Sequence, residues 1–188
     1  IGPDQTVAVS FSGQDVFLDI PEGNGTFTTA AGVHTGSGSI DVGQVTNVAA
    51  WVRGTYTVRF NAPDSWDVLD STNTVIASGA YQSGSAISFN GAQVTISGAP
   101  AAGDTFVIAP ASKESMFKTL DDLASALGAN PQGPVDRSQL YTDLGSALQQ
   151  IDQGLTRVLD RRADVGARLG RRIDHRQSRE SMVDATTE

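Results

Sequence analysis

The last quarter of the chain has the pattern of one long helix whose apolar side a domain of this size cannot bury. No proline occurs from Ser138 to Asp184, and large side chains recur there at alternating spacings of four and three residues. This heptad row, called the seam below, consists of Leu144, Leu148, Ile151, Leu155, Val158, Arg162, Val165 and Leu169. A helix of this length extends about 70 Å at about 1.5 Å per residue. The seam is therefore predicted to contact other helices, from the same protein or from neighbouring subunits.

Small residues beside the seam predict that another backbone approaches this helix closely. Gly166 and Gly170 each lower helix stability by up to about 1 kcal/mol relative to alanine, and they form a strip with Ala163 and Ala167. Arg162 lies on the seam itself and offers a forked donor to a neighbour's carboxylates. The predicted assembly interface consists of Leu144, Leu148, Ile151, Leu155, Val158, Arg162, Ala163, Gly166, Ala167 and Leu169. The alternative is that the seam packs on a preceding helix, which is too short to cover most of it.

Composition divides the chain near residue 112. Up to that point the sequence holds two Lys/Arg against nine Asp/Glu, and 14 of the 20 glycines. Low charge with many turn-forming residues favours a β domain, so the predicted division is a β-rich domain at 1–112 and a helical domain at 113–188. The helical domain is expected to contain a short helix at about 113–127, a connection at about 128–137 and a long helix at about 138–184.

The ends of the short helix have candidate capping residues. Ser112 could accept hydrogen bonds at its N-terminus, although the acid or amide of a full capping box is missing three residues later. Gly128 is a candidate C-cap. Because the following connection is short, the two helices are expected to run antiparallel.

Alternating apolar residues predict the strands. They cover residues 7–11, 56–60, 66–68, 75–77 and 106–108. Asn90-Gly91 accepts the positive φ angles of a tight turn, which predicts a hairpin over 87–97. The glycines between residues 23 and 43 are interpreted as turns. The expected fold class is α+β: an antiparallel β-sandwich or barrel-like domain, followed by a helical hairpin with one long C-terminal helix that resembles a coiled-coil rod.

Charge and composition argue against several classes of function. The formal net charge of -8 disfavours binding to nucleic acid and to anionic membrane surfaces. No stretch approaches the roughly 20 apolar residues of a membrane span. The chain has no cysteine, which excludes disulfide scaffolds, thiolate metal sites and cysteine nucleophiles.

No group of residues has the spacing of a catalytic, metal-binding or cofactor-binding site. His34 is expected in a turn, and His175 on a solvated helix face, where adjacent residues point about 100° apart and cannot form a relay. Asp121-Asp122 is interpreted as exposed helix charge. The acids Asp64, Asp67 and Asp70 lack the central glycine of a calcium loop. We therefore expect no enzyme activity, no cofactor and no metal.

Two features keep a carbohydrate-related alternative open. Trp51 and Trp66 could stack on sugars if they were exposed, although both are expected in the core of a small sandwich. Asn24-Gly25-Thr26 matches a glycosylation acceptor, a pattern that is common by chance. The alternative function is a stalked carbohydrate-binding or adhesive module, and a hydrolase with an unrecognised site is a third.

The long helix resembles the C-terminal helix of the flagellin superfamily. The matching residues are Ile151-Asp152, Val158, Arg162-Ala163 and Gly166-Ala167, and Gly170-Arg171 stands where an Asn-Arg-like pair is expected. Four earlier segments resemble the branch of hook-filament junction proteins, the hook-associated proteins of type 3. These segments are Phe11–Phe17, Gly23–Phe27, Gly36–Gly43 and Gly98–Phe106.

This resemblance implies a rod-like structural subunit of the bacterial flagellum, with the β domain inserted in the helical part and facing outward. Such a subunit is exported through the flagellar type III apparatus and lies outside the cell. Its implied partners are the first hook-associated protein, flagellin and identical subunits in a ring, with an export chaperone for the full-length protein. The chain is expected to be a fragment that lacks N-terminal helices and the terminal polymerisation segments. A flagellin-type filament subunit is the alternative within this superfamily.

Overall fold

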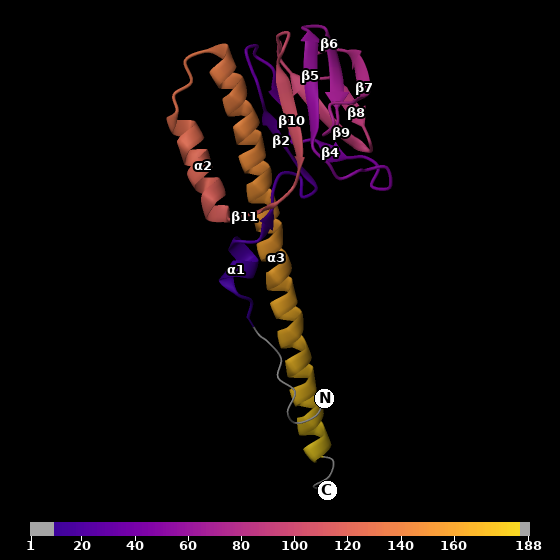
Figure 1. Ribbon diagram of the computed structural model, residues 1–188. Helices are drawn as coiled ribbons and strands as arrows, with labels where there is room; N and C mark the ends of the chain where they lie inside the picture. Colours follow the sequence, from indigo (N-terminus) through magenta and orange to yellow (C-terminus); the bar gives the residue numbers. More distant parts are fainter. Residues whose placement is uncertain (1–9, 185–188) are drawn as a thin grey trace.

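The chain forms two packed β-sheets beside one end of a long helix, which extends far beyond them (Figure 1). This computed structural model describes residues 10–184, with the side chains of His175 and residues 178–184 left undescribed. The predicted α+β class is confirmed: antiparallel sheets are followed by a helical hairpin with one long C-terminal helix.

Every strand pair in the two sheets is antiparallel. The larger sheet has the order β2 (Phe27–Ala31), β10 (Thr105–Pro110), β5 (Tyr56–Ala62), β6 (Ser65–Leu69) and β7 (Val75–Ala80). The smaller sheet has the order β3 (Ser39–Ile40), β9 (Ala92–Ser97) and β4 (Gln44–Val45), and β8 (Ala86–Phe89) also pairs with β9. The predicted strands at 56–60, 66–68, 75–77 and 106–108 lie within β5, β6, β7 and β10.

Alternate side chains of both sheets form one hydrophobic core. Val58 and Phe60 of β5 and Val94 and Ile96 of β9 are fully buried, and the residues between them are more exposed. Burying each such side chain contributes about 1.5–3 kcal/mol. The core needs no contribution from the long helix, because all of its members come from residues 27–108.

Both tryptophans pack against this core and are half-buried. The Trp51 ring lies 5.3 Å from Phe27 and 5.7 Å from Tyr56, measured between centroids. The Trp66 Nε1 donates a hydrogen bond of 3.1 Å to the carbonyl of Ala80. Neither ring is presented as an open stacking surface.

The predicted hairpin is confirmed. Asn90 and Gly91 have φ angles of 42° and 77°, and the strands on either side pair antiparallel, with Ile87 opposite Val94. A Cβ on Gly91 would lie 2.2 Å from the carbonyl oxygen of Asn47, so this turn requires glycine for space as well as for conformation.

The glycines between residues 23 and 43 lie outside strands, but the residues between them form strands that were not predicted. β2 carries the sequence FTTAA, whose threonines and alanines gave no apolar alternation, yet it pairs along its whole length with β10. Of the predicted strand at 7–11, residues 7–9 lie outside the described residues. Phe11 precedes a short helix, α1 (Gly13–Phe17), which Ser12 caps by accepting from the backbone N–H of Asp15.

The segment that contains α1 runs beside the long helix, away from the sandwich core (Figure 1). The guanidinium carbons of Arg161 and Arg168 lie 4.5 and 4.7 Å from the Phe11 ring centroid. The Nε of Arg157 donates to the carbonyl of Asp15. After α1, β1 (Ile20–Pro21) pairs with β11 (Lys113–Glu114), so the chain enters and leaves the sandwich side by side.

The helical hairpin consists of α2 (Met116–Gly128) and α3 (Pro134–Asp184), which run antiparallel (Figure 1). Its ends differ from the sequence prediction. Ser115, not Ser112, caps α2, because Ser112 instead donates to Glu22. Gly128 is the last helical residue and Ala129 is the C-cap. α3 begins at Pro134, since a proline at the first helical position gives up no helical hydrogen bond.

Candidate assembly surface

The residues of the predicted assembly interface lie on a side of α3 that the chain leaves largely uncovered. Leu148, Leu155 and Leu169 are 60%, 55% and 53% exposed. Leu144 and Ile151 are half-buried. The remaining predicted residues, Val158, Arg162, Ala163, Gly166 and Ala167, are exposed. Packing on α2 therefore leaves most of the seam in contact with solvent, and the prediction that it contacts partners remains a prediction.

Further large apolar side chains outside the predicted set are also exposed. On α3 they are Tyr141, Leu159 and Ile173; on α1, its C-cap and α2 they are Phe17, Leu18, Phe117, Leu120 and Leu127. Tyr141 lies seven residues before Leu148, and the same interval leads on to Leu155 and Leu169. This seven-residue interval is the sequence signal that could have included Tyr141 in the predicted assembly interface. The exposed residues of α1 could not have been found, because no predicted element covered residues 13–17.

The face of α3 that packs inside the molecule is polar. Ser138, Thr142 and Gln150 are buried, together with the small residues Ala147 and Gly154. The Thr142 hydroxyl accepts a hydrogen bond of 3.2 Å from the backbone N–H of Ile40. A polar helix face normally predicts exposure to water, so no pattern in the sequence indicated that these residues hold α3 against the sheets.

His34 lies at this joint and not in an open turn. Its Nε2 is 2.7 Å from the Ser138 hydroxyl, which itself donates to the carbonyl of Val135 at 2.7 Å. Because a hydroxyl has one proton, Nε2 must be the donor to Ser138. The other ring nitrogen, Nδ1, is buried without a hydrogen-bond partner and lies 4.0 Å from the Asp104 carboxylate.

Asp104 organises the loop that holds His34. It is fully buried and accepts hydrogen bonds from the backbone N–H groups of Thr35, Gly36 and Ala101 and from the Thr35 hydroxyl, at 2.7–3.0 Å. Burial raises the pKa of this carboxyl, but the four hydrogen bonds together outweigh that effect and hold the pKa below its ordinary value. Asp104 therefore stays ionised and fixes two loops next to the start of α3.

Two kinds of glycine occur along α3. A Cβ on Gly154 would lie 1.8 Å from the Met116 Cε and 3.2 Å from the Ile20 Cδ1, so a side chain at this position would force these two side-chain ends to move. A Cβ on Gly166 or Gly170 would meet nothing within 4 Å. Within the described residues, the two glycines of the predicted strip thus have open space beside them.

The other candidate sites show ordinary structural roles. Asp121 and Asp122 are exposed, and Asp122 pairs with Lys118, which raises the pKa of that lysine together with Glu114. Hydrogen bonds from Thr72 and Thr74 lower the pKa of Asp70. No group of three or more potential ligands that could hold a metal occurs among the described residues. None of the helices described here has the length and hydropathy of a membrane span.

Two further candidates concern Asn24 and His175. The Asn24 side-chain amide donates to the carbonyls of Val42 and Gly43 at 3.2 and 3.1 Å, so the nitrogen that a glycan would modify is engaged in folding. The side chain of His175 lies outside the described residues.

Comparison with known proteins gives the same arrangement of sandwich and rod. FlgL from Xanthomonas campestris is 34% identical with a TM-score of 0.86, over 94% of this chain and 58% of that chain. The flagellar junction protein FlgL from Legionella pneumophila is 32% identical with a TM-score of 0.91, over 97% of this chain and 61% of that chain. The chain resembles flagellar junction proteins over nearly its whole length. These relatives are flagellar proteins and not enzymes.

Other comparisons agree on the flagellar setting. The flagellar hook associated protein-3 from Legionella pneumophila is 33% identical, with a TM-score of 0.91 over 98% of this chain and 60% of that chain. Residues 29–110 match the family of the D2-like domain of flagellar hook-associated protein 1. No curated protein sequence matches the chain. The chain thus spans about 60% of the length of the solved FlgL structures.

Proposed function

We propose that the chain is part of a structural subunit of the bacterial flagellum that joins the hook to the flagellin filament. The observation that carries this proposal is the similarity to the junction protein FlgL over both the sandwich and the long helix. The match to the D2-like domain of hook-associated protein 1 covers residues 29–110, which contain most of the sandwich but no part of α3. The similarity to FlgL, at 32–34% identity, extends over 94–98% of the chain and includes α3, which favours a junction protein.

The proposed partners are the first hook-associated protein on one side, flagellin on the other and identical subunits around a ring. In this proposal the subunit is exported through the flagellar type III apparatus, with a chaperone for the full-length protein, and functions outside the cell. The β-rich part, 1–112, faces outward as a spacer, and the helical part, 113–188, carries the assembly contacts.

The exposed seam supports this assignment. A row of large apolar side chains that stays in water is unfavourable, because burying each leucine or isoleucine contributes about 1.5–3 kcal/mol. We propose that Leu144 to Leu169 contact other helices in the assembled flagellum, with Arg162 pairing with a carboxylate of a neighbour. The strip formed by Ala163, Gly166 and Ala167 then allows a second backbone to approach.

The proposal is tested in a bacterium that lacks its junction protein and sheds flagellin monomers. The full-length protein should restore filament attachment, whereas Leu155→Asp should abolish it, since a carboxylate would replace an apolar contact at the middle of the seam. Val48→Asp is the matched control, because Val48 is an exposed apolar residue of the β4–β5 loop, remote from α3. Normal swimming by Leu155→Asp, or no complementation by the unmodified protein, would contradict the proposal.

A further inference from the structure

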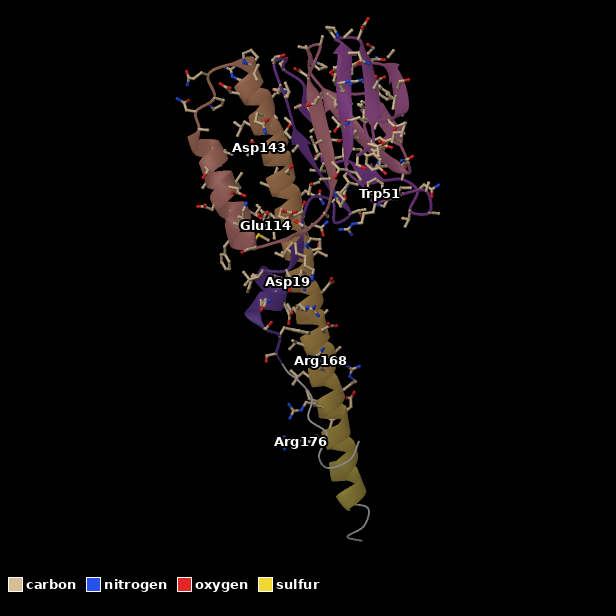
Figure 2. All side chains as sticks on the ribbon, viewed as in Figure 1. Asp19, Trp51, Glu114, Asp143, Arg168 and Arg176 are labelled. Atoms are coloured by element: carbon tan, nitrogen blue, oxygen red, sulfur yellow. The ribbon has the colours of Figure 1, made fainter. Side chains whose placement is uncertain are left out.

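A pocket of about 350 Å³ with a strongly acidic lining lies between α2, α3 and β2. Its four carboxylates are Glu22, Glu114, Asp122 and Asp143; Figure 2 labels Glu114 near the start of α2 and Asp143 on the upper part of α3. Lys118 neutralises part of this charge, with its Nζ 2.8 Å from Glu114 and 2.5 Å from Asp122. Glu22 accepts from Ser112, and Asp143 from the amide of Gln139. Both lack an ion pair with any described residue, so the pocket keeps a net negative charge.

A buried amide in the pocket wall lacks a partner. Gln150 is only 4% exposed, it lines the pocket, and its Nε2 has no hydrogen-bond partner in the described part of the chain. A buried polar group left unpaired costs about 1–3 kcal/mol. A half-turn about its last side-chain bond exchanges the amide nitrogen and oxygen, so this group can offer a donor or an acceptor to a molecule in the pocket. Its unpaired state is independent of the acidic rim, and it leaves a hydrogen-bonding group of the pocket wall without a partner among the described residues.

The same chain carries the complementary charge lower on the rod. Arg171 and Arg172 are adjacent and exposed on α3. At 100° per residue, Arg171 lies about 200° around the helix from both Leu169 and Ile173, so it points away from the exposed apolar residues. A guanidinium presents several donors in a planar fork and can bind two carboxylates and an amide oxygen together.

These arginines cannot reach the pocket of their own chain. Arg171 lies 21 residues after Gln150 on one continuous helix, which places it about 32 Å further along the axis. An arginine side chain that enters the pocket must therefore come from another molecule.

We propose that the pocket binds an arginine of the Arg171–Arg172 pair from a second copy of this chain, displaced by about 30 Å along the rod axis. The guanidinium lies between Glu22 and Asp143, and Gln150 turns its amide oxygen toward it. The contact joins two different surfaces, so it continues from copy to copy instead of closing a symmetric pair. For its setting in the flagellum this inference rests on the proposed function, but the contact can be measured without a flagellum.

The test uses a synthetic peptide of residues 164–178 and the ¹⁵N-labelled 188-residue chain. At low ionic strength, of about 20 mM, the peptide should shift the side-chain amide signals of Gln150 and reach saturation. Asp143→Lys in the chain should weaken binding at least about fivefold, because an exposed ion pair contributes up to about 1 kcal/mol and the new charge repels the peptide. Asp121→Lys is the control, since Asp121 is an exposed carboxylate of α2 that does not line the pocket.

Two altered peptides complete the experiment. A peptide carrying Arg171→Glu and Arg172→Glu should not bind. A scrambled peptide of the same composition should bind more weakly than the native one. Absence of a saturable Gln150 shift, equal loss with Asp121→Lys, or equal affinity of the scrambled peptide would overturn the inference.

The outcomes separate this contact from the proposed function. If the peptide does not bind while the full-length protein restores filament attachment, the contact is wrong and the junction function stands. If the peptide binds as expected but the full-length protein does not restore attachment, the contact stands and the proposed function fails.

Discussion

The sandwich and the long helix differ in how far they bury their apolar residues. In the sandwich, alternate side chains of two sheets cover one another, and large residues such as Phe60 and Phe106 are fully buried. Along α3, most large apolar residues are exposed, others such as Leu144 and Ile151 are only half-buried, and the buried positions hold Ser138, Thr142 and Gln150. The sandwich thus buries its apolar residues within the chain. The long helix instead packs its polar face against the rest of the chain and leaves much of its apolar face available for contact with other helices.

This difference separates the residues that determine the stability of the chain from those proposed to act in assembly. Substitutions in the sandwich should change the free energy of unfolding of the chain itself. Substitutions on the exposed side of α3 should leave that quantity nearly unchanged and alter attachment in the full-length protein. Four pairs of variants test this contrast, in order of decreasing expected effect on the free energy of unfolding.

The largest effect is expected for a phenylalanine of the core. Phe60→Ala should lower the free energy of unfolding by about 3–5 kcal/mol, through lost burial and the cavity left behind. Phe117→Ala is the matched control, because Phe117 is 63% exposed on α2. Denaturant titration followed by tryptophan fluorescence measures both. Equal losses in the two variants would show that the hairpin surface is as important to folding as the core.

A smaller loss is expected at the polar joint. Asp104→Asn would place an amide nitrogen opposite backbone donors, with an expected loss of about 2–4 kcal/mol. Because the folded pKa of Asp104 lies below the unfolded value of about 3.9, its stabilising effect is complete above that pH and is lost as the pH falls through the folded pKa.

The difference in unfolding free energy between the unmodified chain and Asp104→Asn should therefore shrink below about pH 4. Asp64→Asn, in an exposed turn, should cause no comparable change at any pH. A difference that stayed constant down to pH 2 would contradict the role of the Asp104 charge.

The two kinds of glycine on α3 give a third comparison. Gly154→Val should destabilise the chain by about 1–3 kcal/mol, because its side chain would collide with Met116 and Ile20. Gly166→Val has open space and should change stability by less than about 0.5 kcal/mol. Thermal unfolding of the two variants measures this difference in stability. In the full-length protein, Gly166→Val should weaken filament attachment more than Gly154→Val does, if Gly166 faces a neighbouring backbone.

The smallest effect on folding is expected for the charged member of the seam. Arg162→Ala should change the free energy of unfolding by less than about 0.5 kcal/mol, while it weakens filament attachment by the full-length protein. Arg53→Ala, an exposed arginine of the β domain, should affect neither. A large drop in the unfolding midpoint of Arg162→Ala would show that this residue is part of the fold and not of an interface.

Local patterns predicted the elements whose structure depends on near neighbours. The Asn90-Gly91 turn, the alternation in β5 and the uninterrupted α3 were readable because each is decided within a few residues. β2 could not be recognised, since its threonines and alanines become a strand only by pairing with β10, about 80 residues later. Helix ends were misplaced by a few residues where Ser112 bonded to a distant glutamate instead of capping α2.

The candidate surface divides in the same way. The heptad spacing alone identified Leu148, Leu155 and Leu169, and their exposure follows directly from that row having no partner helix of sufficient length. The burial of His34, Asp104, Ser138 and Gln150 was decided only by tertiary structure. Buried polar residues stabilise a fold when donors and acceptors from different segments meet and replace the water that would otherwise bind them. Because these partners lie far apart in the sequence, the pattern of one segment does not predict which residues will pair.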